Sequence, residues 1–171
     1  MMNKCIFLDR DGVINIDCVD YTYKVDEFKI IEGVPKALKM LKDHGYLLVV
    51  ITNQSGIVKG IYDHSDMHQC HEYLQNEINH LIDYFYYSPY HEKYTASLTR
   101  KPGTLMFERA IAKFDVDIAQ SWMIGDKERD MLPAKKLGIR TILLPEDGLK
   151  TASADIMKKD LLEAAEYITS L

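Results

Sequence analysis

The stretch CIFLDRDG at residues 5–12 sets four apolar residues directly before two acids and a glycine. A short, continuous apolar run of this kind is typical of a strand that is covered on both faces of a parallel sheet. Asp9 and Asp11 leave that strand two residues apart, so both carboxylates can point into one crevice, and Gly12 allows the backbone to turn sharply. A plain turn with solvated charges is the alternative that these residues alone leave open.

Apolar runs of strand length alternate with longer segments of helical period along the rest of the chain. Further strands are expected at Leu47–Ile51, Tyr84–Tyr87, Ser121–Ile124 and Thr141–Leu144. Helices are expected at Val34–His44, Ser65–Leu81, Gly103–Phe114, Arg129–Leu137 and about Asp160–Ile168. This alternation predicts an α/β fold, a doubly wound, Rossmann-like three-layer sandwich with a mostly parallel central sheet. Because the chain has no repeat, low-complexity tract or linker, residues 1–171 are expected to form a single domain.

The composition is that of an ordinary globular chain, with 47% hydrophobic and 27% charged residues and a formal net charge of −5. A nucleic-acid footprint normally needs a basic excess or a basic stripe, so we expect no nucleic-acid partner. No apolar run approaches membrane-spanning length, which predicts no membrane partner. The three cysteines are widely spaced, form neither a disulfide framework nor a CxxC knuckle, and favour a cytoplasmic setting.

Two polar clusters follow the expected second and third strands. The first is TNQSG at residues 52–56, whose hydroxyls, amides and main-chain N–H groups suit phosphate oxygens. An ordinary strand-to-helix turn favours the same residue types and is the alternative. The second is Arg100 and Lys101, just before an expected helix, where a fixed ammonium can stabilise a phosphoryl group in transit. A solvated basic turn is the alternative there.

The expected fourth strand ends in GDKERD at residues 125–130. Asp126 could complete a Mg²⁺ site begun by Asp9 and Asp11, since this ion takes a few carboxylates and keeps several waters. Asp130 lies one helical turn on and is expected to orient Lys127 or a bound water. A helix N-terminus that favours acids through its dipole is the alternative. In open α/β sheets ligands bind beyond the carboxyl ends of the strands, so the clusters taken jointly predict one site there.

These clusters resemble the four signature motifs of the haloacid dehalogenase (HAD) superfamily of phosphohydrolases. The matching stretches are DRDG at 9–12, TNQ at 52–54, KP at 101–102, and GD at 125–126 with Asp130. Within the superfamily the chain resembles the branch of histidinol-phosphate and D-glycero-D-manno-heptose 1,7-bisphosphate phosphatases, whose members are small and lack a large cap domain. The resemblance covers most of the chain.

The resemblance implies a Mg²⁺-dependent phosphatase that acts on a small phosphorylated metabolite. Asp9 would be the nucleophile that forms an aspartyl-phosphate, and Asp11 would protonate the leaving alkoxide and then activate water. Mg²⁺ would be held by Asp9, the main-chain carbonyl of Asp11, and Asp126. The phosphoryl oxygens would be held by Thr52, Asn53 and Lys101.

The same resemblance implies contacts to the rest of the substrate and a set of supporting residues. Substrate contacts are expected at Asn53, Gln54, Ser55, Arg100, Lys127 and, in the loop over residues 17–21, at Asp17 and Tyr21. Supporting roles are expected for Gly12, Gly125 and Asp130. Heptose bisphosphate is the first choice of substrate and histidinol phosphate the second, and a monomer is expected.

One stretch departs from the branch. Many relatives carry a zinc loop of the form C-x-H…C-x-C before the Arg-Lys-Pro motif, whereas this chain has Ser88, Tyr90, Ser97 and Thr99 at those positions. Neutral hydroxyls cannot replace thiolates around structural zinc, so we predict no zinc. We expect packing of tyrosines to hold the loop instead, namely Tyr86, Tyr87, Tyr90 and Tyr94. The adjacent His91 is expected on the surface of the loop.

Other functions stay open on the sequence. A polynucleotide 3′-phosphatase uses a similar motif set, but the acidic balance and the short chain count against it. A phospho-accepting signalling domain would carry its acid after the third strand rather than the first, and a non-catalytic binding module would not need Asp9, Asp11, Lys101 and Asp126 intact. His64, His68 and His71 recur at helical spacing, and we interpret them as a solvated helix face rather than a metal site.

Overall fold

A six-stranded parallel sheet forms the centre of the computed structural model, which describes residues 2–145 and 153–171. The strand order is β3-β2-β1-β4-β5-β6, and each neighbouring pair is parallel. The strands are β1 (Cys5–Leu8), β2 (Leu47–Asn53), β3 (Tyr84–Ser88), β4 (Trp122–Gly125), β5 (Arg140–Leu143) and β6 (Ile156–Met157). The chain reverses direction along the sheet after β3, so β1 and β4 are neighbours at the centre and their ends form the switch point at which ligands bind.

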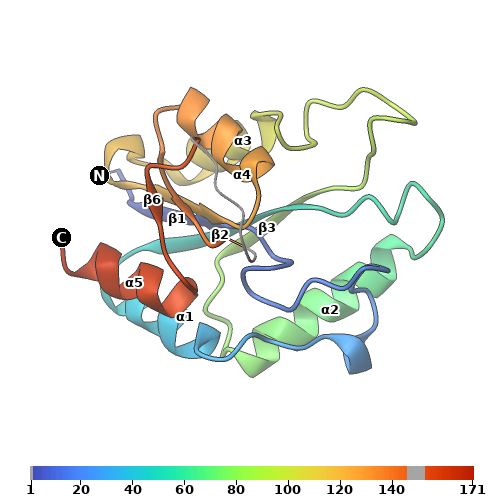
Figure 1. The fold of residues 1–171 in the computed structure, drawn as a ribbon, viewed down its shortest axis with the longest axis horizontal. Helices are drawn as coiled ribbons and strands as arrows, with labels where there is room; N and C mark the ends of the chain where they lie inside the picture. Colours follow the sequence, from blue (N-terminus) through green and yellow to red (C-terminus); the bar gives the residue numbers. More distant parts are fainter. Residues whose placement is uncertain (1, 146–152) are drawn as a thin grey trace.

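Helices cover both faces of this sheet, as Figure 1 shows. One face carries α1 (Val34–Asp43), α2 (His64–Glu77) and α5 (Leu161–Thr169), and the other carries α3 (Leu105–Phe114) and α4 (Glu128–Lys136). Two 3₁₀ turns, η1 (Val25–Glu27) and η2 (Ile118–Gln120), lie in connections. The predicted doubly wound α/β sandwich is confirmed.

Two apolar cores explain why the strands read as continuous apolar runs. Side chains alternate across β1, so that Ile6 and Leu8 pack into the core under α1 and α5 while Cys5 and Phe7 pack into the core under α3 and α4. All four of these residues are fully buried. A strand with a core on each face needs no polar side, as the sequence of β1 indicated.

Some element boundaries differ from the sequence-based expectation. Helix α2 begins at His64, one residue before the expected Ser65, because the Asp63 side chain caps it and accepts hydrogen bonds from the first turn. It ends at Glu77, short of Leu81, because Asn79 and His80 adopt positive φ angles. The short edge strand β6 was not predicted, since two residues carry no readable periodicity. None of the described helices is long and apolar enough to cross a membrane.

Candidate active site

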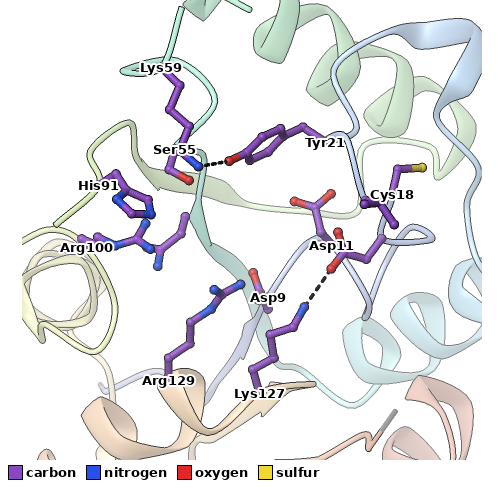
Figure 2. A pocket seen from close by; sticks show the side chains of 13 residues that line it. Asp9, Asp11, Cys18, Tyr21, Ser55, Lys59, His91, Arg100, Lys127 and Arg129 are labelled. Carbon is purple, nitrogen blue, oxygen red and sulfur yellow. Dashed lines mark hydrogen bonds and ion pairs between the residues drawn. The ribbon is translucent and has the colours of Figure 1, made fainter. Parts of the chain in front are cut away.

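A cavity of about 400 Å³ opens at the carboxyl edge of the sheet. Eight residues predicted from the sequence line it: Asp9, Asp11, Asp17, Tyr21, Asn53, Ser55, Arg100 and Lys127. Figure 2 shows the side chains of Asp9, Tyr21 and Lys127 converging from separate segments. Four others lie buried behind this lining: Thr52, Gln54, Lys101 and Asp126. The convergence follows from the topology, because β1, β2 and β4 are adjacent parallel strands whose carboxyl ends meet at one edge.

Lys101 joins three segments at the base of the cavity. Its ammonium lies 2.9 Å from Asp9 Oδ1 and 2.6 Å from Asp130 Oδ1, and it donates a 2.6 Å hydrogen bond to the Ile51 carbonyl. Burial lowers the pKa of Lys101, but the carboxylates of Asp130 and Asp9 outweigh burial and raise it overall. The side chain therefore stays protonated and holds its charge next to Asp9.

Three buried carboxylates, those of Asp9, Asp126 and Asp130, bring oxygens within 4.8 Å of one another. Burial and then the Asp130 carboxylate raise the pKa of Asp9 to about 6, and burial and then Asp9 raise that of Asp126 to about 6. Asp126 Oδ1 is buried and accepts no hydrogen bond from any described residue. Crowded, desolvated acids with a free oxygen are what a hard dication stabilises, so this cluster fits Mg²⁺.

The two oxygens of Asp130 are already engaged, because Oδ1 pairs with Lys101 and Oδ2 accepts the Lys127 main-chain N–H at 3.1 Å. Asp9 and Asp126 are therefore the side chains that remain for an ion. Gly12 leaves room for the Asp126 carboxylate, because a Cβ at this position would overlap it. The φ of +84° at Gly12 also favours glycine. Of the two expected roles for Asp130, orienting Lys127 or a bound water, the structure shows a contact to the Lys127 main chain.

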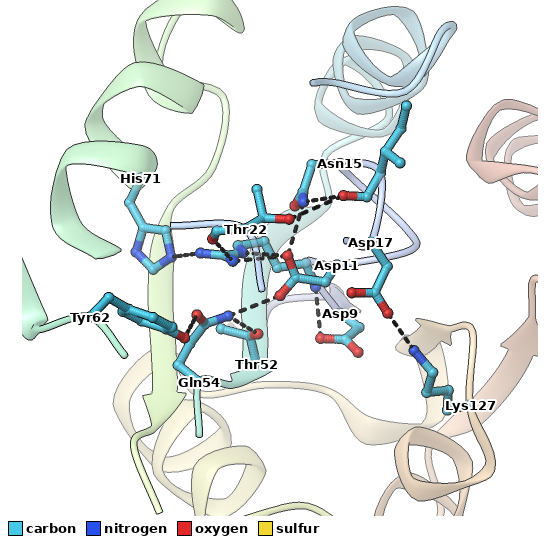
Figure 3. Close-up of polar contacts among 12 residues, drawn as sticks. Asp9, Asp11, Asn15, Asp17, Thr22, Thr52, Gln54, Tyr62, His71 and Lys127 are labelled. Atoms are coloured by element: carbon cyan, nitrogen blue, oxygen red, sulfur yellow. Dashed lines mark hydrogen bonds and ion pairs between the residues drawn. The ribbon is translucent and has the colours of Figure 1, made fainter. Parts of the chain in front are cut away.

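A hydrogen-bond network fixes the Asp11 carboxylate, as Figure 3 shows. Oδ1 accepts from Arg10 Nη2 at 2.8 Å and from Asn15 Nδ2 at 2.9 Å, and Oδ2 accepts from Gln54 Nε2 at 3.0 Å. Gln54 in turn donates to Thr52 Oγ1 at 3.0 Å. Gln54 is 1% exposed and does not line the cavity, so the structure places it as a support for Asp11 and not as the substrate contact that we expected.

Arg10 was missed in the sequence, although its place between two acids was a signal. It is 1% exposed, donates to the Thr22 carbonyl at 2.8 Å and lies 3.4 Å from Nε2 of His71. His71 is 5% exposed and stacks on Phe85 with 4.4 Å between ring centres. The interpretation of His71 as part of a solvated face is therefore wrong, while the exposure of His64 and His68 agrees with it.

Cationic side chains surround the mouth of the cavity. Lys127 pairs with Asp17 at 2.7 Å and Asp126 at 2.9 Å, and Lys59 donates to the Tyr21 hydroxyl at 2.6 Å. Arg129 also lines the cavity, and its buried Nε has no hydrogen-bond partner among the described residues. Lys59, Arg129 and His91 were not predicted as site residues, because their positions depend on how the loops fold back over the strand ends.

Known proteins resemble this chain in sequence and in fold. A family model described as HAD-hydrolase-like matches residues 98–169. The D-glycero-β-D-manno-heptose-1,7-bisphosphate 7-phosphatase of Haemophilus ducreyi is 38% identical over 98% of this chain and 100% of that protein. The chain belongs to the HAD-like phosphatase family. The enzyme of the same name from Helicobacter pylori strain J99 is 37% identical over 97% of each chain.

The fold of this HAD-like phosphatase matches solved relatives over nearly its full length. The D,D-heptose 1,7-bisphosphate phosphatase of B. bronchiseptica, solved with magnesium and phosphate, superposes with a TM-score of 0.89 at 26% identity and covers 98% of both chains. The corresponding enzyme from Burkholderia thailandensis gives a TM-score of 0.71 at 28% identity over 99% of this chain and all of that one. The HAD-like fold expected from the motifs is confirmed.

The loop before Lys101 differs from the expectation in this phosphatase. Three hydroxyls bond to one another, with Thr99 Oγ1 lying 3.0 Å from Ser88 Oγ and 2.8 Å from Ser97 Oγ. Tyr90 and Tyr94 are 41% and 61% exposed, so the prediction that tyrosine packing holds the loop is wrong for these two. Ser88, Ser97 and Thr99 stand at the positions of three cysteines in the zinc-loop pattern, and their hydroxyls bond to one another. The absence of zinc stays a prediction.

Asn53, which we expected to contact the phosphoryl oxygens and the substrate, also bonds to the main chain of Lys101. Its amide accepts from the Lys101 main-chain N–H at 3.0 Å and donates to the Lys101 carbonyl at 3.1 Å. This pair of bonds fastens the loop that carries Lys101 to the end of β2. In the phosphatase, Asn53 therefore positions Lys101 as well as lining the cavity.

Proposed function

We propose that the chain is a Mg²⁺-dependent phosphomonoesterase that removes the 7-phosphate of D-glycero-D-manno-heptose 1,7-bisphosphate. The observation that carries the proposal is the Asp9 carboxylate held 2.9 Å from a buried ammonium at the base of an open cavity. Relatives whose names state this activity align over almost the whole chain. The proposal extends to residues 1–171 acting as one cytoplasmic, monomeric domain without zinc.

Asp9 and Asp11 divide the chemistry between them. An Asp9 oxygen forms a bond to phosphorus in line with the leaving oxygen, and the P–O bond to the sugar breaks as Asp11 delivers a proton to the alkoxide. Asp11 then takes a proton from the water that attacks phosphorus, which frees Asp9 and inorganic phosphate. Arg10, Asn15 and Gln54 keep the Asp11 carboxylate oriented for both transfers.

Lys101 supplies fixed positive charge for the phosphoryl oxygens, and its buried ammonium needs no reorganisation as charge shifts. Asp9, Asp126 and the Asp11 main-chain carbonyl would hold Mg²⁺, which when bound offsets repulsion between nucleophile and phosphate. Thr52 is 1% exposed and engages Gln54, so it acts at the back of the site.

The cations at the cavity mouth support a substrate with a second anionic group. Lys59, Arg100, Lys127 and Arg129 line the opening, and of these Arg129 has a buried Nε without a partner among the described residues. A second phosphate would accept from such donors. Histidinol phosphate carries an amine, and its positive charge would meet this cationic rim, which favours heptose bisphosphate over it.

Phosphate release from a matched substrate set tests the proposal. Heptose 1,7-bisphosphate, the 1-phosphate, histidinol phosphate and a 3′-phosphorylated oligonucleotide are each assayed with Mg²⁺ and with chelator. We expect the bisphosphate to give the highest kcat/KM, chelator to stop turnover, and Asp9→Asn to lower kcat at least about 10³-fold while melting remains cooperative. Substantial turnover by Asp9→Asn, or faster release from the oligonucleotide, would overturn it.

A further inference from the structure

A second cavity, of about 320 Å³, lies at the amino edge of the sheet, opposite the active site. Its lining comes from residues at or before the starts of four strands, among them Lys4, Tyr46, Trp122 and Arg140, together with the ends of α1 and α5. Its volume is at the lower end of the range for small-molecule sites. Nothing in the proposed phosphatase reaction uses these residues.

Two residues that line this cavity each carry a buried hydrogen-bond donor without a partner among the described residues. Trp122 is 2% exposed, and neither its Nε1 nor the buried Nε of Arg140 is hydrogen-bonded to any described residue. The two residues are register neighbours on β4 and β5, and the guanidinium carbon of Arg140 lies 4.0 Å from the centre of the indole ring. Indole and guanidinium N–H groups only donate, so only an acceptor can satisfy them. Buried unsatisfied donors call for such an explanation.

The charged side chains that line the cavity all have the same sign. Lys4 and Arg140 contribute cations and His44 an imidazole, and none of the described lining residues has a carboxylate side chain. The Lys4 ammonium lies 4.2 Å from the centre of the Tyr46 ring, which is 9% exposed. In a chain of net charge −5, two cations held over aromatic rings in one hollow form a local exception that attracts anions.

We propose that this cavity is a binding site for a small organic oxyanion, a molecule bearing a carboxylate or a phosphate group. The oxyanion accepts from the Arg140 guanidinium and the Lys4 ammonium, which neutralise its charge, and the Tyr46 and Trp122 rings contact its carbon skeleton. A guanidinium that is already stacked on an indole loses little freedom when it binds, which favours such a contact.

Trp122 makes the proposal directly measurable, because it is the only tryptophan in the chain. Its emission is followed during titration with inorganic phosphate or with malonate, at constant ionic strength against chloride and with chelator present. We expect a saturable change with at least one of the two anions, and the one that binds identifies the oxyanion. Arg140→Gln and Lys4→Gln should each weaken the apparent affinity at least about ten-fold.

Lys39→Gln is the matched control, since Lys39 is an exposed lysine paired with Asp43 outside this cavity. It should bind as the wild type does, and Arg140→Gln should retain phosphatase turnover within about two-fold, because Arg140 lies at the opposite edge of the sheet. A flat titration, a response equal to that of chloride, or a response unchanged by Arg140→Gln would overturn the proposal. If Arg140→Gln fails to fold by circular dichroism, Lys4→Gln decides the outcome.

Discussion

Two loops bring charge to the cavity, and they are held in different ways. The loop after β1 places Asp11 through a guanidinium, that of Arg10, which is 1% exposed and bonded to main chain and side chains alike. The loop after β3, which Figure 1 shows projecting beyond the sheet, places Arg100 through an ion pair with Glu92, whose side chain is 69% exposed. Neutral hydroxyls at Ser88, Ser97 and Thr99 complete its support.

The two kinds of support differ in how much free energy is lost when they are broken. Breaking a buried ion pair leaves an uncompensated charge and costs about 3–5 kcal/mol, whereas a neutral hydrogen bond contributes about 1 kcal/mol and an exposed ion pair about 0–1 kcal/mol. Asp11, the proposed proton-transferring group, is thus rigidly fixed. The loop at the cavity mouth can change sequence at small cost, so substrate preference can vary while the reaction stays the same.

Removing the buried guanidinium of Arg10 should have the largest effect on stability and turnover. Arg10→Met leaves Asp11 with two amide partners, and we expect a stability loss of about 3–5 kcal/mol and a kcat about 10²-fold lower on the bisphosphate, with KM little changed. Thermal melting and steady-state kinetics measure both effects. A p-nitrophenyl ester, whose leaving group needs no proton, should lose less than the sugar phosphate.

Arg10→Lys is the control that keeps the positive charge but lacks the planar set of guanidinium N–H donors. It should recover part of the stability but little of kcat. Equal losses of kcat on the sugar phosphate and the p-nitrophenyl ester would contradict the positioning of Asp11 by Arg10.

The buried histidine of the same network predicts a pH dependence of stability. Burial, and then the Arg10 guanidinium, lowers the pKa of His71 well below the ordinary 6.5. Below about pH 6.5 the unfolded chain therefore binds a proton that the folded chain excludes, so stability falls as pH drops through this value and is unaffected above it. In His71→Gln this contribution is absent.

Urea midpoints at about pH 7.5 and about pH 5.5 measure the effect. The difference between the two midpoints should be smaller in His71→Gln than in the wild type and unchanged in His64→Gln, which alters an exposed histidine. If His71→Gln kept the wild-type difference between the two urea midpoints, His71 would be excluded as the source of the pH dependence.

The hydroxyl cluster of the second loop should give a smaller effect. Thr99→Val removes the hydroxyl that joins Ser88 and Ser97, and we expect a loss of about 1–2 kcal/mol and a KM a few-fold higher at unchanged kcat. Thr99→Ser keeps the hydroxyl and should match the wild type. A kcat loss as large as that of Arg10→Met would remove the distinction between the loops.

The exposed ion pair should matter least. Glu92→Gln removes the partner of Arg100, but the Tyr90 carbonyl still accepts from Arg100 at 3.0 Å. We expect KM to change by about two-fold or less and the melting temperature to stay the same, as for exposed pairs generally. A large rise in KM for the bisphosphate alone would show that Glu92 positions Arg100 for the second phosphate.

The sequence predicts what depends on local pattern and on topology. Apolar runs locate β1 to β5, and the parallel order then brings Asp9, Lys101 and Asp126 together. The sequence does not predict contacts between distant segments when neither segment contains a recognisable motif for that contact. Arg10 and His71 are 61 residues apart, and helical spacing cannot tell whether a face will meet solvent or another loop.

The loop at 88–99 shows the same limit. The sequence indicates that zinc ligands are missing, but not that Ser88 and Thr99, 11 residues apart, will meet. The amino-edge cavity depends likewise on Trp122 and Arg140 becoming register neighbours, which only the strand pairing determines.

Lys101 has a consequence beyond catalysis. One ammonium ties the end of β1, the main chain of β2 and the first turn of α4, so this set of contacts around Asp9 is complete only when all three have docked. A partly folded chain carries the acids but lacks this arrangement. Under the proposed function, the site is therefore assembled only in the fully folded chain.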